Sequence, residues 1–281
     1  MPLLERAGQP ALHYRLDDYT DPWRKAPYLI LQHGYGRSGK FWYSWVPYLS
    51  RFYRVVRPDL RGLGKSQAPA DLETGLNVAA YIDDLLALIE ALGGGPVHYC
   101  GESLGGILGM VLAAEHPQKL RTLSLVAAPV LINRDTQTTF AFGHPTWQEA
   151  LRALGARGWA QAANTATRFP ADTDPGLMAW YADEMGASNV EVLIRMSRIA
   201  ASVDATPYLE RIKTPTLGLY PSQAPVTIQA QEQTLKDKIA ALKIVHVPAR
   251  HHTIQNLLPA TLARQVLYFA AQHDGFSCEE P

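Results

Sequence analysis

The stretch Val97-His98-Tyr99-Cys100-Gly101-Glu102-Ser103-Leu104-Gly105-Gly106 decides the predicted fold. It begins as a short apolar strand, turns at a Gly-x-Ser-x-Gly pattern, and continues into a helix rich in alanine and leucine over Ile107–Glu115. A serine at the tip of such a turn takes a strained backbone conformation, and the flanking glycines relieve the crowding. The helix that starts at Leu104 points its N-terminal dipole and free N–H groups at charge developing beside the serine. The pattern therefore predicts that Ser103 is a nucleophile.

Strand and helix signals alternate on both sides of this stretch, which predicts an α/β fold. Such alternation implies mostly parallel strands joined by right-handed crossovers, and hence a sheet covered by helices on both faces. The predicted strands are Tyr28–Gln32, Tyr53–Arg57, Val97–Cys100, Leu120–Val126, Thr216–Tyr220 and Lys243–Val247. The predicted helices of this part are Asn77–Leu92, Ile107–Glu115 and Leu257–Ala271.

The strand signal disappears between about Asn133 and Ala205. Short helices are predicted there over Trp147–Leu154, Leu177–Met185 and Val190–Ala201. We therefore expect a core formed by residues 1–132 and 206–281 and an inserted helical cap formed by residues 133–205. The polar tail Asp274–Pro281 is expected to be loose.

Composition excludes several classes of function. The 281 residues carry 26 Lys+Arg and 26 Asp+Glu, so the net charge is zero and favours neither a nucleic-acid partner nor a membrane surface. The opening residues lack the basic start and apolar run of a signal peptide, and the two cysteines make no disulfide framework. The expectations are a cytoplasmic protein with a small-molecule substrate, with a homodimer left open. Neither a metal ion nor any other cofactor is predicted, because no metal-ligand spacing or phosphate-binding glycine motif is present.

A loop after an early strand is predicted to complete the site. His33-Gly34-Tyr35-Gly36 follows the first apolar strand, in the chain order that an oxyanion hole of this kind requires. The backbone N–H groups of Tyr35 and Leu104 could then converge on one oxygen. His33 itself is expected to brace the loop.

These features together resemble the α/β-hydrolase superfamily, in its small cap-bearing group of enol-lactonases, C–C bond hydrolases, amide hydrolases and esterases. The resemblance rests on His33-Gly34, on Asp59-x-Arg61-Gly62-x-Gly64-x-Ser66, on the turn around Ser103 and on a late histidine. It implies a bracing role for Asp59 and Arg61. It also implies that the base lies about seven residues before the proline that opens the last helix, which favours His252 over its neighbour His251.

A serine–histidine pair normally has a third member, an acid that orients the imidazole. At the position that resembles the family's acid this chain has Ala224, and the earlier alternative around Ala127-Ala128-Pro129 offers no carboxylate either. The candidates left open are Asp135, Glu232, a neutral group such as Ser222 or Gln223, or no third member at all.

The resemblance implies hydrolysis of a small ester, lactone, amide or C–C bond substrate through an acyl-enzyme. Two alternatives stay open: a cofactor-free dioxygenase or lyase on the same fold, and a ligand-binding protein without catalysis. A substrate carboxylate could be held by an arginine, for which the candidates are Arg37, Arg134, Arg168 and Arg250. Aromatic residues that could line the pocket are Phe41, Trp42, Trp45, Trp147, Trp159, Trp180 and Tyr181.

Overall fold

A computed structural model describes residues 2–278 of the chain and contains one eight-stranded sheet. The strand order is β1-β2-β4-β3-β5-β6-β7-β8, with β1 and β2 antiparallel to their neighbours and the remaining pairs parallel. The α/β class, with a mostly parallel sheet, is therefore confirmed. The strands are β1 Leu3–Arg6, β2 Gln9–Asp17, β3 Tyr28–Gln32, β4 Arg54–Pro58, β5 Val97–Glu102, β6 Leu120–Val126, β7 Thr216–Pro221 and β8 Leu242–Val247.

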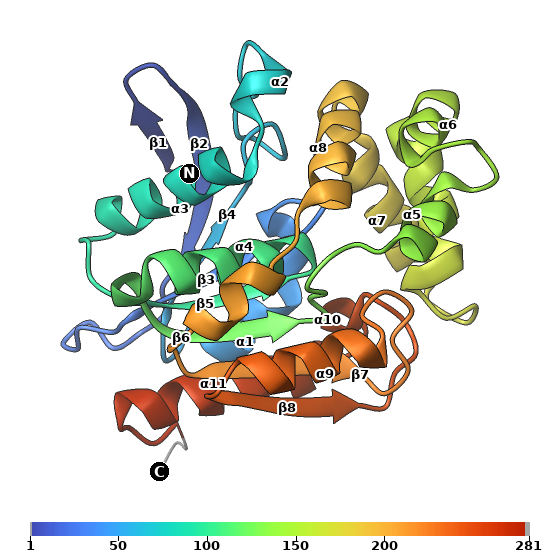
Figure 1. Cartoon of the computed structure of the whole chain (residues 1–281). Coiled ribbons are helices and arrows are strands. Elements are labelled where there is room, and N and C mark those ends of the chain that lie inside the picture. Colours follow the sequence, from blue (N-terminus) through green and yellow to red (C-terminus); the bar gives the residue numbers. More distant parts are fainter. Residues whose placement is uncertain (1, 279–281) are drawn as a thin grey trace.

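Helices cover both faces of this sheet (Figure 1). The α-helices are α1 Val46–Leu49, α2 Leu72–Gly75, α3 Val78–Ala91, α4 Leu104–Glu115, α5 Arg134–Ala141, α6 Trp147–Ala163, α7 Pro175–Gly186, α8 Val190–Ser202, α9 Gln229–Lys238, α10 Ile254–Leu257 and α11 Pro259–Asp274. Short 3-10 helices are η1 Gly39–Trp45, η2 Pro117–Lys119 and η4 Thr206–Arg211, and η3 Asn164–Arg168 is a π-helix.

Two hydrophobic cores form because neighbouring side chains of a strand point to opposite faces of a sheet. In β3, Ile30 belongs to the core that contains α3, α4 and the inserted helices. Its neighbours Leu29 and Leu31 belong to the core under α11, together with Leu262. Because β3 is buried on both faces, Leu29, Ile30 and Leu31 form a continuous apolar run instead of alternating with polar residues.

Most predicted elements are present, and the differences have local causes. The strand β5 runs two residues further than expected, to Glu102, and α4 begins at once at Leu104. The predicted closing helix Leu257–Ala271 corresponds to α11, which begins two residues later because Pro259 has no N–H to continue a helix and instead opens a new one. The short helix α10 before it was not predicted. The hairpin β1–β2 was not predicted from the sequence.

The four helices α5, α6, α7 and α8 lie between β6 and β7 in the chain. In Figure 1 they form a group beyond the carboxyl ends of β6 and β8. We propose that residues 133–205 act as a cap on the core, since active sites of open α/β sheets lie at the carboxyl ends of the strands.

The expectation of a loose tail from Asp274 onward is wrong at its first residue. Asp274 ends α11, its side chain is 5% exposed, and it pairs with His98 and Arg121. The last three residues of that predicted tail, 279–281, lie outside the described residues.

Candidate active site

The turn between β5 and α4 holds Ser103 in a strained conformation. Its φ of 53° and ψ of −121° lie where non-glycine residues are rare. The Ser103 N–H donates to the carbonyl of Val126 at 3.1 Å, which ties the turn to the neighbouring strand. A Cβ on Gly101 would overlap the carbonyl of Gly105, and one on Gly105 would lie 2.6 Å from the carbonyl oxygen of Gln32. Only glycine fits at these two positions, and the serine hydroxyl is thereby lifted off the sheet.

His252 reaches Ser103 from the loop after β8. Its Nε2 lies 3.1 Å from the Ser103 Oγ, which is hydrogen-bonding distance across 149 residues of chain. The backbone N–H of His252 donates to the carbonyl of Thr167, and the hydroxyl of Thr253 donates to the carbonyl of Arg168. These contacts fix the histidine loop against the inserted helices. His251 is half-buried and makes no such contact with Ser103 among the described residues.

The imidazole of His252 is neutral at ordinary pH. Burial, and then the positive charges of Arg37 and Arg168, lower its pKa well below 6.5. A neutral imidazole can accept the serine proton at Nε2, so the pair is in the protonation state that general-base chemistry requires.

The loop after β3 packs directly against the serine turn. A Cβ on Gly34 would lie 2.9 Å from the Ser103 Cβ and 2.8 Å from the Glu102 carbonyl oxygen. Tyr35 and Leu104 line the same cavity as Ser103 and His252. Leu104 is also the first residue of α4, whose first N–H groups have no partner within the helix. This placement is the one that an oxyanion hole would need.

The acid candidates from the sequence do not reach His252. Asp135 is exposed on α5, and the Glu232 carboxylate pairs with His246 at 2.6 Å. Ser222 donates its hydroxyl to the carbonyl of Val247, and Gln223 is exposed. In the part of the chain that the structure describes, no side chain is hydrogen-bonded to Nδ1 of His252.

An acid that the sequence reasoning missed lies beside the pair. Glu102, the last residue of β5, is 1% exposed, and its Oε1 lies 3.5 Å from Nε2 of His252. That oxygen has no hydrogen-bond partner within residues 2–278, while Oε2 accepts a hydrogen bond from Arg37. Burial raises the pKa of Glu102, and the Arg37 charge offsets only part of this. The available signal was a carboxylate at the end of a fully buried strand, where charge is rare without a partner.

Two of the four arginine candidates lie at the cavity. Arg37 pairs with Glu102 and donates from Nε to the Tyr181 hydroxyl. Arg168 is 2% exposed and lies over the rings of Trp159 and Tyr181, at 5.2 and 5.3 Å from the ring centroids. Arg134 and Arg250 are exposed.

Only part of the aromatic set lines the cavity. Trp147 and Trp159 do so, with Phe140, Ile132 and Val226. Trp42 and Trp45 are in the opposite core, where the Trp45 indole donates to the carbonyl of Gln255. The pocket interpretation of these two tryptophans is therefore wrong, because the helix η1 turns them away from the serine.

The cavity around Ser103 is narrow. Its volume is about 20 Å³, the size of a water molecule, so a substrate enters only when side chains that line the cavity move. Arg37 also lines a second pocket of about 180 Å³, together with Arg15, Lys40 and Glu184. The Arg37 side chain is thus a wall between the cavity and this outer pocket.

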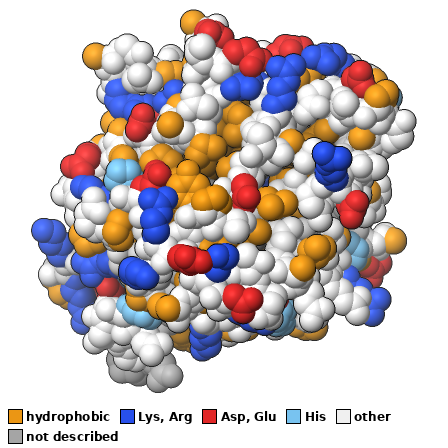
Figure 2. Space-filling model, in the orientation of Figure 1, with side chains coloured by type: hydrophobic (Ala, Val, Ile, Leu, Met, Phe, Trp, Pro, Cys, Tyr) orange, Lys and Arg blue, Asp and Glu red, His pale blue; other side chains and the backbone are white. Residues whose placement is uncertain are grey.

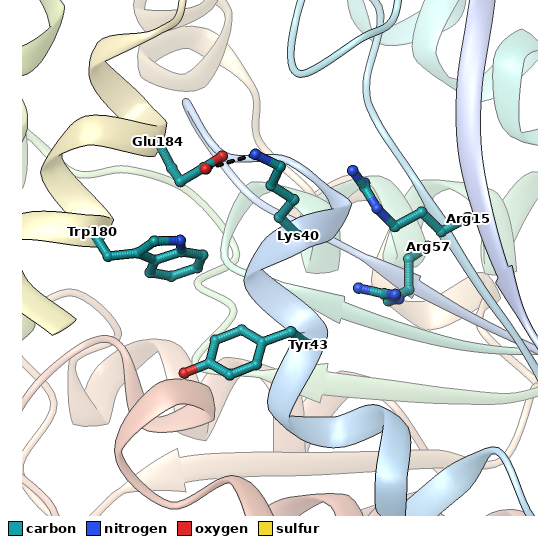
Figure 3. Close-up of a pocket in the computed structure, with 6 residues that line it drawn as sticks. All are labelled: Arg15, Lys40, Tyr43, Arg57, Trp180 and Glu184. Atoms are coloured by element: carbon teal, nitrogen blue, oxygen red, sulfur yellow. Dashed lines mark hydrogen bonds and ion pairs between the residues drawn. The ribbon is translucent and has the colours of Figure 1, made fainter. Parts of the chain in front are cut away.

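A larger surface pocket of about 500 Å³ lies next to the outer pocket (Figure 3). The two pockets share Arg15, Lys40 and Glu184. Lys40 on η1 donates to Glu184 on α7 at 2.6 Å, and the rings of Tyr43 and Trp180 lie 5.4 Å apart beside them. The surface pocket shares no lining residue with the cavity around Ser103, so we interpret it as an approach to the site and not as the site itself.

Residues that the sequence suggested as braces hold the loops around the site. Burial lowers the pKa of His33 to about 4, and its Nε2 accepts the Leu60 N–H at 3.0 Å. The Asp59 carboxylate accepts the N–H groups of Gly39 and Lys65 and the Nδ1–H of His13. Arg61 makes a two-point ion pair with Asp84. All these contacts are within the protein, which agrees with a structural role.

The described residues contain neither a metal cluster nor a membrane span. No group of three or more His, Cys, Asp or Glu side chains is placed to hold a metal ion within residues 2–278. None of the helices in that range is long and apolar enough to cross a bilayer. On the face shown in Figure 2, positive and negative side chains are intermixed.

Comparison with known proteins assigns the family. A model of the alpha/beta hydrolase fold matches residues 27–185. A RutD protein of Stutzerimonas stutzeri, provisionally named a carbamate hydrolase, is 30% identical over 217 residues, which cover 73% of this chain and 76% of that protein. The crystal structure of the enol-lactonase from Burkholderia xenovorans has a TM-score of 0.84 at 25% identity and covers 95% of this chain and 99% of that one. A hydrolase from Pseudomonas aeruginosa has a TM-score of 0.81 at 26% identity, covering 95% and 97%. With a family model over more than half of its length and a relative that is 30% identical over 73% of it, this chain belongs to the alpha/beta hydrolase family.

Proposed function

We propose that the protein hydrolyses a small acyl substrate, an ester, lactone, amide or carbamate, through an acyl-enzyme on Ser103. Hydrolase activity is what the matched proteins have in common. The observation that carries the finer proposal is the 3.1 Å contact between the Ser103 hydroxyl and Nε2 of His252. A serine becomes a useful nucleophile only when a base can take its proton, and this geometry supplies that base.

The proposed reaction has two halves. His252 Nε2 takes the hydroxyl proton while Ser103 Oγ attacks the substrate carbonyl, and the N–H groups of Tyr35 and Leu104 bind the oxyanion. The carbonyl re-forms, the leaving group departs with the proton from Nε2, and the acyl group remains on Ser103. Water then gives a proton to Nε2 and attacks the acyl carbon, and the acid is released as Ser103 regains its proton.

Glu102 is proposed as a positioning residue for His252. In a usual triad the acid contacts the far nitrogen and stabilises the imidazolium. Here the unpartnered Oε1 lies 3.5 Å from Nε2, the nitrogen that receives the proton. A carboxylate at this distance favours the charged imidazole, while Arg37 holds the carboxylate in place through its other oxygen.

The substrate class follows from the chemistry that the relatives share. Carbamate and enol-lactone cleavage, which name two of the matched proteins, both begin with attack on a carbonyl that bears an oxygen or nitrogen leaving group. The site proposed here performs that attack.

The test combines covalent labelling with matched variants. Wild-type protein is expected to form a fluorophosphonate adduct on Ser103 and to hydrolyse p-nitrophenyl esters. Ser103→Ala and His252→Ala should each lower kcat by roughly 10⁴-fold or more, while His251→Ala, the neighbouring control, should stay near wild type. Turnover that survives Ser103→Ala and depends on oxygen would instead support base-only chemistry. Tight ligand binding without any turnover would support a binding protein.

A further inference from the structure

We propose that the catalytic cavity takes an acyl substrate that carries one carboxylate, and that Arg168 binds this carboxylate. The proposal rests on the hydrolase function above and deepens it by naming the charge of the substrate.

Arg168 is a buried cation that forms no ion pair with a carboxylate among the described residues, although the charge of Glu102 acts on it from beyond ion-pair distance. It lines the cavity with Ser103 and His252, and it is 2% exposed. Its Nη1 contacts only the Asn164 amide oxygen at 3.3 Å and the Met185 sulfur at 3.1 Å. Within residues 2–278 no carboxylate forms an ion pair with it. Burying an unpaired charge costs several kcal/mol, so a cavity that keeps one is suited to a ligand that supplies the opposite charge.

The charged side chains around the cavity carry one net positive charge. Arg37 is balanced by Glu102, with which it forms a buried ion pair. His252 is neutral, since burial and the two arginines depress its pKa. Burial also lowers the pKa of Arg168 to about 10, so that its guanidinium still carries its charge at neutral pH. A substrate with a single carboxylate would neutralise the site, and the planar guanidinium can bind such a group with two hydrogen bonds.

The outer pocket that leads to the cavity also contains more basic than acidic side chains. Arg37 separates the cavity from the outer pocket, whose other basic residues are Arg15, Lys40 and Lys65. The acids of that pocket are fewer than its bases, and both are paired. Asp59 accepts two backbone N–H groups and the Nδ1–H of His13 and lies 3.9 Å from Arg15, and Glu184 pairs with Lys40. Basic residues along an approach raise the local concentration of anionic substrates.

A bound carboxylate would also act on the base. The charged groups that face His252 are Arg37 from the loop after β3, Glu102 from β5 and Arg168 from η3. Neutralising Arg168 removes one of the causes that depress the pKa of His252 and makes the imidazolium easier to form. The substrate would thereby supply some of the negative charge that a third triad member usually provides, and its effect should appear in kcat as well as in KM.

The test compares esters that differ only in charge. The mono-p-nitrophenyl esters of glutarate and adipate carry one carboxylate, and p-nitrophenyl pentanoate and hexanoate are their neutral counterparts of equal acyl length. The wild-type protein should prefer the charged esters in kcat/KM. Arg168→Met should lower kcat/KM for the charged esters by roughly 10- to 100-fold more than it lowers kcat/KM for the neutral ones. Arg168→Lys should restore part of the loss.

Two controls separate the possible failures. Arg250→Met, which changes an exposed arginine near the same loop, should alter neither series. Fluorophosphonate labelling of Ser103 in Arg168→Met shows whether the site is folded. Hydrolysis of both series with no charge preference, or an equal loss on both in a labelled Arg168→Met, would overturn the carboxylate proposal and leave the serine mechanism standing. If the wild-type protein is not labelled at Ser103, the serine mechanism itself is overturned.

Discussion

At the scale of single residues, the site contains residues whose conformation or burial is unfavourable. Ser103 has a strained backbone, Glu102 and Arg168 are buried charges, and His252 is a buried base. Such arrangements persist where the surrounding structure holds them, and they are concentrated at functional sites. The protonation state of His252 can be measured directly from the pH dependence of the rate. It is set by the pKa of His252, on which the nearby Glu102 carboxylate acts.

The pH dependence of kcat/KM should report that base. Because the pKa of His252 lies below 6.5, the imidazole stays neutral and active as pH falls through 6.5, and kcat/KM should decline only at lower pH.

Glu102→Gln removes the negative charge 3.5 Å from Nε2, so we expect kcat to fall by about 10-fold. The acidic limb of the pH profile, where kcat/KM declines, should not move to higher pH.

Glu232→Gln is the matched control for this change, since Glu232 pairs with His246 and not with the site. It should leave both kcat and the limb unchanged. A decline of wild-type kcat/KM that already begins at or above pH 6.5 would contradict the lowered pKa of His252. Equal effects of the two Glu→Gln variants on kcat would contradict the role of Glu102.

At the scale of elements, the turn between β5 and α4 depends on how closely the backbones approach. Gly105 packs its Cα against the carbonyl of Gln32 at the end of β3, so a methyl group there would push the helix away from the strand. The serine, the loop after β3 and the first N–H groups of α4 all depend on that contact.

Gly105→Ala should therefore destabilise the protein by about 1–3 kcal/mol and displace Ser103. Chemical denaturation gives the free energy of unfolding, and the rate of fluorophosphonate labelling reports the serine. Gly158→Ala, within α6 and with its nearest neighbour at 3.4 Å, is the control and should be neutral or stabilising by up to about 1 kcal/mol. Similar free energies of unfolding for Gly105→Ala and Gly158→Ala would show that the close contact at Gly105 does not contribute to the stability of the turn.

At the scale of the whole molecule, the end of the chain is tied to the middle of the sheet. Asp274 at the end of α11 accepts hydrogen bonds from His98 on β5 at 2.8 Å and from Arg121 on β6 at 2.7 Å. Burial alone would raise the pKa of Asp274, but His98 and Arg121 reverse this and leave it below 3.8. The folded state therefore holds the carboxylate more strongly than the unfolded chain does. The resulting stability is fully present above pH 3.8 and is lost as pH falls through the lowered pKa.

Asp274→Asn should lower the free energy of unfolding at neutral pH by about 1–2 kcal/mol and weaken the loss of stability below pH 3.8. Asp172→Asn, at an exposed loop position, should change neither. Parallel stability curves for wild type and Asp274→Asn below pH 3.8 would refute the linkage.

Much of this architecture could be predicted because its causes are local. Short segments rich in apolar residues identified β3 and β6 with their observed bounds, and the glycines around Ser103 predicted the turn. The hairpin β1–β2 was missed because β1 is short, half-exposed and ends in charged residues, so it carries no apolar pattern. Proximity between distant residues was predictable for the loop after β3, from chain order, and for His252, from the spacing to Pro259 that the family resemblance implies.

The amino-acid sequence by itself determined the α/β class, the strained serine and the loops that must meet at the carboxyl edge of the sheet. These follow from side-chain period, from glycine's freedom at a tight turn and from the order of strands and helices. The tertiary structure alone decided which charges face one another: Glu102 and not Asp135 or Glu232 beside His252, Arg37 balanced, and Arg168 buried without a carboxylate. Electrostatic energy depends on distance and burial, and neither is encoded in the separation of residues along a chain.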